Sequence, residues 1–347
     1  MNPLLEVKDL VAEFNTPGGP LRILDKVNFS LQPAEILALV GETGCGKSVS
    51  AKSILNLIPD TICRRTGRID FCGTDLIGLS NKEMQLYRGR KIGMIFQNPI
   101  ASINPVFTLG EQICRLVNLH MDEKIRQRRK DQHLSKKEII KAIARENLEK
   151  VGLTDIDQLM KAYPNQISGG MAQRFRIAMG LMGDPEIMIA DEATSALDVT
   201  VQAHILRLLK QLSQENKTAI LFITHDLGIA AQICHRVAVM YSGRIVETAP
   251  TVQLFKNPLH PYTKGLLGAV PQLGKARALT QIPGVIPDLR NPPAGCRFHP
   301  RCDRAMERCR KIRPPQVRMD DRMVCCHLYN QADNDSLNVV DVRGGRA

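Results

Sequence analysis

Residues 36–48 read Ile36-Leu-Ala-Leu-Val-Gly-Glu-Thr-Gly-Cys-Gly-Lys-Ser48. The first five residues form an uninterrupted apolar run, which is typical of a strand that is buried on both faces of a sheet. Glycines follow the run, and the pattern of residues 48–57 predicts a helix. A buried strand, a glycine-rich loop and a helix form, in this order, the βα unit of a doubly wound sheet. The stretch therefore predicts an α/β fold.

The glycine-rich loop also has the residues of a phosphate-binding site. It fits the P-loop pattern of two glycines, a lysine and a serine, and it lies between a strand and a helix as that motif requires. Its glycines let backbone N–H groups point at phosphate oxygens, and the helix N-terminus adds partial positive charge. We expect Lys47 to reach the β- and γ-phosphates of a nucleotide and the Ser48 hydroxyl to bind Mg²⁺.

Cys45 is expected to contribute mainly its backbone, with a thiol pKa that the helix N-terminus lowers. The whole loop and the residue after it are candidate nucleotide contacts: Gly41, Glu42, Thr43, Gly44, Cys45, Gly46, Lys47, Ser48 and Val49.

A second apolar run, residues 187–190, ends in two carboxylates, Asp191 and Glu192. One carboxylate of such a pair can hold Mg²⁺ through water, and the next can orient or deprotonate an attacking water. Many strands end in acidic residues, so the pair alone is a modest signal. Together with a P-loop in the same chain, it indicates a nucleotide hydrolase.

Residues 167–173, Ile-Ser-Gly-Gly-Met-Ala-Gln, open a predicted helix with serine and glycine, which makes a second candidate anion site. One nucleotide does not need two such sites from one chain. We therefore expect Ser168, Gly169 and Gly170 to close over a nucleotide held by a second subunit. The alternative is an ordinary helix N-cap followed by a glycine turn.

Composition narrows the class of protein. The 347 residues are 44% hydrophobic and 24% charged, as in globular proteins of about two domains. No apolar run approaches the roughly 18–20 residues of a membrane-spanning helix, and the start of the sequence lacks the pattern of a signal peptide, so we expect a cytoplasmic protein. The net charge of +12 favours phosphate-rich or anionic partners. Only 4% of residues are aromatic and none is Trp, which disfavours a single-strand nucleic-acid binder.

The remaining patterns predict how the chain is organised. Residues 4–10 and 27–31 alternate like half-exposed strands, residues 16–20 form a turn, and apolar spacing over residues 110–165 predicts helices. The basic stretch 124–130 is interpreted as a solvated helix face, with contact to anionic lipid or a partner as the alternative. Further expected elements are a helix at 202–214, a buried strand at 219–223 and a hairpin at 237–247.

After residue 250 the composition shifts to Pro, Arg and Cys. The expected divisions are a domain at 1–250 with a helical subdomain at about 105–180, a small Cys-rich domain at 251–330, and a polar, flexible tail at 331–347.

Six motifs in order resemble those of ATP-binding cassette (ABC) transporter ATPases, and the resemblance covers residues 4 to about 330. They are the P-loop 41–48, the Q-loop glutamine Gln97, the signature 167–171, the Walker B strand 187–192, the D-loop 195–198 and the switch histidine His225 in 224–226. The resemblance implies a P-loop NTPase cassette with a RecA-like core, an antiparallel β-subdomain and a helical subdomain. Ile167, Ala172 and Ala193 depart from the usual residues, but none of these changes removes a reacting group.

The resemblance also implies residue roles in binding and hydrolysing ATP. Glu192 would be the catalytic base, and His225 would contact the γ-phosphate. Gln97 would sense Mg²⁺ and couple to a membrane subunit, and an aromatic residue, here Phe14, would stack on adenine unless it is a core residue. The expected Mg²⁺ ligands are Ser48, Gln97 and Asp191, and Asp198 is a further candidate nucleotide contact.

Residues 97–105, 257–263, 282–287 and 295–302 resemble the oligopeptide and dipeptide importer ATPases, a group that includes nickel importers. The resemblance implies three kinds of partner: a second, related ATPase chain, two membrane permease subunits and an extracytoplasmic substrate-binding protein. Nucleic acid is not expected as a partner. The chain would act at the cytoplasmic face of the inner membrane, with peptide as the favoured solute. A DNA or chromosome ATPase would need a long coiled coil between residues 47 and 168, and a translation factor would need a second P-loop.

Cys296, Cys302 and Cys309 are followed by Cys325 and Cys326. Four thiolates suit an iron–sulfur cluster or zinc, but zinc ligands usually come in pairs two to four residues apart, so iron–sulfur is favoured over zinc and over unligated thiols. The resemblance implies a [4Fe–4S] cluster whose last ligand is Cys326, with Cys325 as a spare.

Overall fold

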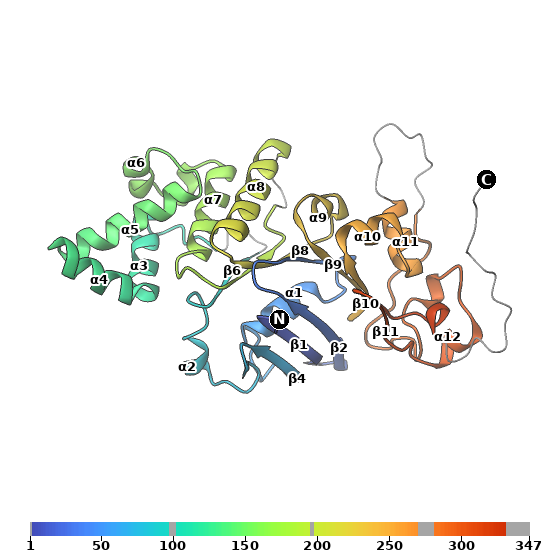
Figure 1. Cartoon of the computed structure of the whole chain (residues 1–347). Helices are drawn as coiled ribbons and strands as arrows, with labels where there is room; N and C mark the ends of the chain where they lie inside the picture. Colours follow the sequence, from blue (N-terminus) through green and yellow to red (C-terminus); the bar gives the residue numbers. More distant parts are fainter. Residues whose placement is uncertain (1, 97–101, 195–197, 270–280, 331–347) are drawn as a thin grey trace.

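The computed structural model describes residues 2–96, 102–194, 198–269 and 281–330. It shows an α/β protein with two sheets (Figure 1). The larger sheet has eight strands in the order β11-β12-β10-β9-β3-β8-β7-β6, and the smaller sheet has four in the order β2-β1-β4-β5. The larger sheet contains β3 (Ile36–Val40), β6 (Ile92–Ile95), β7 (Ile187–Asp191), β8 (Ala219–Thr224), β9 (Arg236–Tyr241), β10 (Arg244–Pro250), β11 (Val317–Met319) and β12 (Arg322–Val324).

The centre of the larger sheet is parallel, as the opening stretch predicts. Strand β3 pairs in parallel with β8 and β9, and β7 pairs in parallel with β6 and β8. Every residue of β3, β7 and β8 is buried. Alternate residues face opposite layers: Leu37 and Leu39 lie in the core shared with the smaller sheet, whereas Ile36 and Ala38 lie in the core shared with the helices. The carboxyl ends of β3, β7 and β8 consequently meet at one edge.

The smaller sheet is antiparallel and consists of β1 (Leu5–Thr16), β2 (Gly19–Leu31), β4 (Cys63–Phe71) and β5 (Thr74–Asp75). Its strands extend further than the sequence predicts, because β1 and β2 pair as far as Thr16 and Gly19 and leave only residues 17–18 for the expected turn at 16–20. The helix α1 (Lys47–Ile54) ends three residues before the expected 57. Its Ala51 and Ile54 pack between the two sheets.

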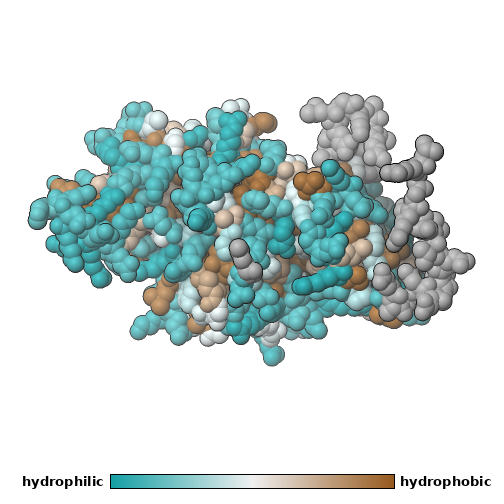
Figure 2. Space-filling view, in the orientation of Figure 1, coloured by the Kyte–Doolittle hydropathy of each residue, from teal (hydrophilic) through white to brown (hydrophobic). Residues whose placement is uncertain are grey.

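The region expected to be helical contains α3 (Leu109–His120), α4 (Asp122–Gln132), α5 (Lys136–Lys150), α6 (Ile156–Lys161) and α7 (Gly169–Gly180). These helices form one end of the molecule, whose visible surface is mostly hydrophilic (Figures 1 and 2). Capping boxes begin α3 and α5, where Thr108 pairs with Glu111 and Ser135 with Glu138. The basic stretch 124–130 lies on α4, and Arg128 forms an ion pair with Glu146 at 2.6 Å.

The C-terminal region continues the larger sheet, because β12 pairs with β10 and β11 pairs with β12. The expected hairpin is formed by β9 and β10, and the expected helix at 202–214 is α8 (Val199–Glu215). Within the described ranges, no helix is long and apolar enough to cross a membrane. The division into domains near residue 250 stays a prediction. The other helices are α2 (Asn81–Met84), α9 (Leu227–Ile233), α10 (Thr251–Lys256), α11 (Pro261–Gly268) and α12 (Glu307–Lys311), with short 3-10 helices η1 (Pro164–Gln166), η2 (His299–Arg301) and η3 (His327–Tyr329).

Candidate nucleotide-binding site

The loop after β3 has the conformation that its glycines permit. Gly44 and Gly46 have φ values of 82° and 105°, in the left-handed region that disfavours other residues. A Cβ atom on Gly46 would also lie 2.7 Å from the side chain of Leu24, which leaves no room for a larger residue. The loop therefore turns tightly from the buried strand into α1, which begins at Lys47.

The Lys47 side chain lies inside this loop and is buried. Its ammonium donates hydrogen bonds to the carbonyl oxygens of Gly41 at 2.7 Å and Glu42 at 3.0 Å. The loop thus encloses a positive charge at the N-terminus of a helix, and both features favour an anion such as phosphate.

Ser48 and Asp191 meet across the edge of the sheet, although 143 positions separate them. The Ser48 hydroxyl donates to Asp191 Oδ1 at 3.0 Å. Burial raises the pKa of the Asp191 carboxyl, and the Ser48 hydrogen bond opposes this rise. A hydroxyl and a carboxylate are oxygen ligands of the kind that Mg²⁺ uses together with phosphate oxygens and waters. These residues therefore fit a Mg²⁺-nucleotide.

Glu192 and His225 form a second pair at the same edge. Strands β7 and β8 are neighbours, with Asp191 opposite Ile223, so the residues that follow the two strands lie together. His225 Nδ1 lies 3.3 Å from Glu192 Oε1, and the imidazole is largely exposed. Glu192 has a φ of 48°, an unusual value for a non-glycine residue that often marks a functional position. The two side chains expected to act on the γ-phosphate and on water are therefore in contact.

Other candidates lie elsewhere or outside the described residues. Gln97 and residues 195–197 of the D-loop lie outside them. Ser168 caps α7, with Oγ accepting a hydrogen bond from the N–H of Met171 at 3.3 Å, and Asp198 caps α8 in the same way. In the described ranges, no hydrogen bond or ion pair joins residues 168–170 to residues 41–48. The nucleotide contacts of these residues stay predictions.

Phe14 lies on β1 between Leu21 of β2 and Cys63 of β4, and it packs against the core of the smaller sheet. Its stacking on adenine is a prediction that this packing does not test. Val49 is half-buried in α1, and Thr43 is exposed at the tip of the loop.

The expectation of a lowered pKa for Cys45 is wrong. Its side chain is buried, and burial raises the pKa of the thiol more than the nearby Lys47 ammonium lowers it. The packing of the loop against the core outweighs the lowering that was expected from the helix N-terminus.

Comparison with known proteins agrees with this geometry. Residues 24–195 match the ABC transporter family, and residues 246–309 match the C-terminal region of oligopeptide/dipeptide transporters. The chain is 43% identical to the dipeptide transport ATP-binding protein DppD of Bacillus subtilis, over 95% of this chain and 96% of that protein. The chain belongs to the ABC transporter family. It is 47% identical to the oligopeptide transport ATP-binding protein OppD of the same organism, over 92% of this chain and 86% of that one.

Solved structures of other ABC cassettes share the fold. A dimeric, post-hydrolysis structure of the ATP-binding cassette MJ0796 with ADP and phosphate has a TM-score of 0.61 and 25% identity, and the match covers 71% of this chain and 98% of that one. CbiO1 from Clostridium perfringens, part of the transporter complex CbiONQ, has a TM-score of 0.57 and 25% identity, covering 74% and 92%. The predicted cassette fold is confirmed, and this member of the ABC family is an ATPase.

Two further residues of this ABC ATPase link its motifs and were not singled out from the sequence. Arg176 of α7 donates to the carbonyl oxygen of Phe96 and to the side-chain oxygen of Gln173, whose amide donates to the carbonyl oxygen of Ala193. Burial lowers the pKa of Arg176 to about 10. The chain of bonds runs from the residue before Gln97 to the residue after Glu192. Gln173 and Arg176 are three positions apart on one helix face, which is the only signal the sequence offers.

The cysteine-rich segment of the ABC ATPase gathers four thiols around one small cavity, lined by Cys296, Cys302, Cys309 and Cys326. The segment is tied together where the N–H of Cys296 donates to the carbonyl oxygen of Cys309 at 2.8 Å. Burial, with the neighbouring cysteines adding to it, raises the pKa of Cys296 to about 11 and of Cys326 to about 12. Among the described residues, no group of three or more His, Cys, Asp or Glu is arranged to hold a metal ion. The donor set fits a soft metal or cluster, but the [4Fe–4S] and zinc assignments stay predictions.

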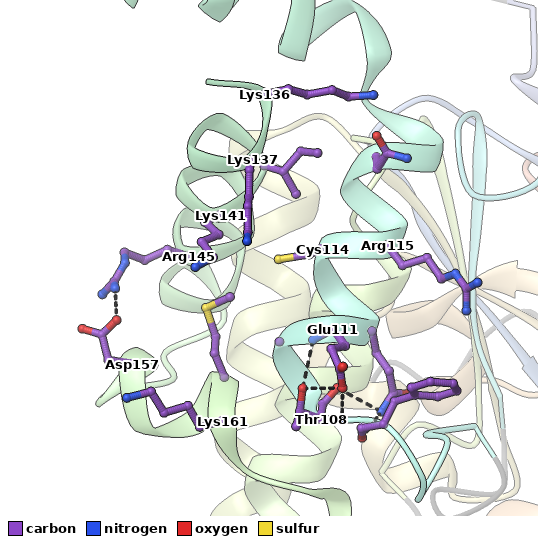
Figure 3. A pocket seen from close by; sticks show the side chains of 16 residues that line it. Thr108, Glu111, Cys114, Arg115, Lys136, Lys137, Lys141, Arg145, Asp157 and Lys161 are labelled. Carbon is purple, nitrogen blue, oxygen red and sulfur yellow. Dashed lines mark hydrogen bonds and ion pairs between the residues drawn. The ribbon is translucent and has the colours of Figure 1, made fainter. Parts of the chain in front are cut away.

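Two larger cavities are lined by residues other than those of the glycine loop. One of about 910 Å³ lies between α3, α5 and α6, with Lys136, Lys137 and Lys141 along α5 and Arg115 on α3 (Figure 3). Glu111 and Asp157 line the same cavity, and Asp157 pairs with Arg145, so the lining carries charges of both signs. The other, of about 680 Å³, is lined by the end of α1, by β6 and by α3, and includes Phe96.

Proposed function

We propose that this chain is the ATP-binding and ATP-hydrolysing subunit of an importer that takes di- or oligopeptides across the cytoplasmic membrane. The observation that carries the proposal is the meeting of Lys47, Ser48, Asp191, Glu192 and His225 at one edge of the parallel sheet. The names of the similar dipeptide and oligopeptide transport proteins support the solute class.

In the proposed mechanism, the glycine loop and Lys47 hold the phosphates, and Ser48, Asp191 and Gln97 hold Mg²⁺. A bound Mg²⁺ would neutralise negative charge on the phosphate oxygens. Glu192 takes a proton from the attacking water, and His225 orients the Glu192 carboxylate and contacts the γ-phosphate. His225 Nδ1 already lies 3.3 Å from Glu192 Oε1, so the imidazole can orient this carboxylate without a change in the pairing of β7 with β8.

A second, related cassette would complete the site. Ser168, Gly169 and Gly170 are exposed or half-exposed at the start of α7, and Asp198 is exposed at the start of α8, so both can face a partner chain. Each ATP would lie between the glycine loop of one cassette and the signature of the other. ATP binding favours the closed pair, and hydrolysis favours the open one.

The remaining partners would lie at the cytoplasmic face of the membrane. The cavity beside Phe96 is a suitable place for a cytoplasmic segment of a permease subunit, because it adjoins both the start of the Q-loop and Asp191. Two permease subunits would form the pore, and an extracytoplasmic binding protein would deliver the solute.

The cysteine cavity would hold a [4Fe–4S] cluster, with zinc as the alternative. Cys325 does not line this cavity, and it directly precedes Cys326 in an extended segment, so the two side chains point in different directions. Anaerobic purification followed by iron, sulfide and zinc analysis tests the assignment. A colourless protein that contains zinc would overturn it.

The test of transport uses Lys47→Ala in the complete importer, reconstituted in vesicles with its binding protein. The wild type should import a labelled dipeptide when ATP is inside, and the variant should not. Import of nickel but not of peptide would show that the solute is nickel. The proposed import function would be wrong if DNA or ribosomes raised the rate of ATP hydrolysis and permeases left it unchanged.

A further inference from the structure

An arginine of the C-terminal region contacts the P-loop. Arg301 ends the short helix η2, directly before Cys302, and Glu42 is the second residue of the glycine loop. The Arg301 guanidinium donates to Glu42 Oε2 at 2.8 Å and to Oε1 at 3.1 Å. The two residues are 259 positions apart, and two parallel hydrogen bonds of this kind fix direction as well as distance.

This arginine is held in place by more than the carboxylate. Its side chain is only 5% exposed, its Nε donates to the carbonyl oxygen of Pro283 at 2.9 Å, and its guanidinium carbon lies 5.8 Å from the centre of the Tyr241 ring. Exposed ion pairs contribute little because both partners move and are solvated. Arg301 is buried and has partners besides Glu42, so its contact with Glu42 constrains the loop.

A second residue of the C-terminal region holds the backbone of Glu42. The Tyr262 hydroxyl accepts a hydrogen bond from the Glu42 N–H at 3.1 Å. Tyr262 is fully buried, with its ring 4.6 Å from the centre of Tyr241 and 5.3 Å from that of Phe298. Because Lys47 donates to the Glu42 carbonyl oxygen, all three polar groups of Glu42 have fixed partners.

We propose that Arg301 and Tyr262 are positioning residues for nucleotide binding, so that the C-terminal region completes the P-loop from outside the cassette motifs. The inference rests on the proposed binding of ATP at residues 41–48. Tyr262 fixes where the loop begins. Arg301 neutralises the Glu42 carboxylate, which would otherwise place an unbalanced negative charge beside the site of a polyanion.

The test measures binding of a non-hydrolysable imido analogue of ATP, with Mg²⁺, to the full-length chain by calorimetry. Arg301→Met should weaken binding roughly tenfold, because hydrogen bonds between charged groups each contribute more than neutral ones. Arg301→Lys keeps the charge but loses the bidentate geometry, so it should recover part of the affinity. Tyr262→Phe keeps the ring packing and should have a smaller effect of the same sign.

Two further variants separate positioning from a general effect on folding. Arg310→Met removes an exposed arginine of α12 that forms an ion pair with Glu307, and it should leave affinity within twofold of the wild type. The double variant Glu42→Gln/Arg301→Met removes both charges and should bind more tightly than Arg301→Met alone. Thermal unfolding of each variant shows whether it is folded at the temperature of the titration.

The outcomes distinguish this inference from the proposed nucleotide site. If Lys47→Ala binds the analogue as well as the wild type, the assignment of the P-loop as the ATP site is wrong. If Lys47→Ala loses binding but Arg301→Met retains it, only the role of Arg301 is wrong. Equal losses in Arg301→Met and in the double variant would also overturn it, because Arg301 would then not act through the Glu42 carboxylate.

Discussion

Asp191 shows how a single residue can be useful to a site and costly to the fold. Its carboxyl is buried at the end of β7 and accepts a hydrogen bond from Ser48. Burial raises its pKa, which means that the folded protein destabilises the charged form at neutral pH. A site for a divalent cation needs the charged carboxylate. The folded protein is therefore less stable when no cation is bound to balance this charge.

Asp191→Asn should therefore stabilise the nucleotide-free protein while it abolishes Mg²⁺-dependent hydrolysis. Because the folded-state pKa is raised, the protonated carboxyl stabilises the fold at low pH, and this stability is lost as the pH rises through the folded pKa. Asparagine has no such charge, so we expect a melting temperature about 1–3 °C higher at pH 7, measured by calorimetry. Asp198→Asn, at an exposed cap that asparagine also satisfies, is the matched control. A lower melting temperature for Asp191→Asn would contradict the argument.

Glu192→Gln should bind ATP but hydrolyse it at least about 100-fold more slowly, because a positioned general base contributes that much or more. The amide keeps the size of the side chain and loses the base. Single-turnover hydrolysis by the complete importer measures the effect, and size-exclusion chromatography with ATP should show a trapped pair of cassettes. Glu186→Gln, an exposed acid just before β7 that pairs with Lys91, is the control. Normal hydrolysis by Glu192→Gln would show that another group is the base.

At the scale of elements, α7 connects three motifs. The signature serine Ser168 caps its N-terminus, and Arg176 and Gln173 in its body bond to backbone carbonyls beside the Q-loop and the Walker B strand. A helix is rigid over this length, so a displacement at one of these points is transmitted to the others. In the proposed importer, the helix would thus link the permease and the partner cassette to Glu192.

Arg176→Met should break this link and also cost stability, because it leaves the side-chain oxygen of the buried Gln173 without its Arg176 donor. We expect a loss of roughly 1–3 kcal/mol in the free energy of unfolding, measured by denaturant titration. Stimulation of ATP hydrolysis by permease and substrate should fall more than the basal rate. Arg207→Met, at an exposed position of α8, should change neither quantity. Full stimulation in Arg176→Met would show that coupling does not pass through α7.

For the whole molecule, the C-terminal region contacts the cassette at several points. Strand β12 extends the main sheet, and Asp25 of β2 forms an ion pair with Arg297 at 3.1 Å. Arg301 then joins the cysteine cavity to the P-loop, since it directly precedes Cys302. The state of the cysteines and the affinity for nucleotide are therefore expected to depend on each other.

Cys302→Ser should lower the iron content of anaerobically purified protein and weaken binding of the ATP analogue by about threefold, a modest coupling over this distance. Metal analysis and calorimetry on the same preparation measure the two effects. Cys325→Ser removes the neighbouring thiol outside the cavity and should alter neither. Loss of iron with unchanged affinity would show that the cavity and the P-loop act independently.

Local patterns in the sequence were sufficient to predict the parallel core, the glycine loop and the helical region. The reason is that strand burial, glycine conformation and helix periodicity depend on residues a few positions apart. The boundaries of elements were predicted less accurately. Helix α1 ends before 57, and β1 and β2 extend into the expected turn. The strands extend because pairing with a neighbouring strand decides where a strand ends.

Only the tertiary structure decided which distant residues meet. The contact of Glu192 with His225 depends on the register of β7 and β8, and the pair of Arg301 with Glu42 depends on how the C-terminal region folds back over the sheet. Burial of Cys45 likewise reversed a pKa that its local position alone would lower. Strand order, register and burial arise from packing across the whole chain, and these long-range contacts leave no periodic signal in a single sequence.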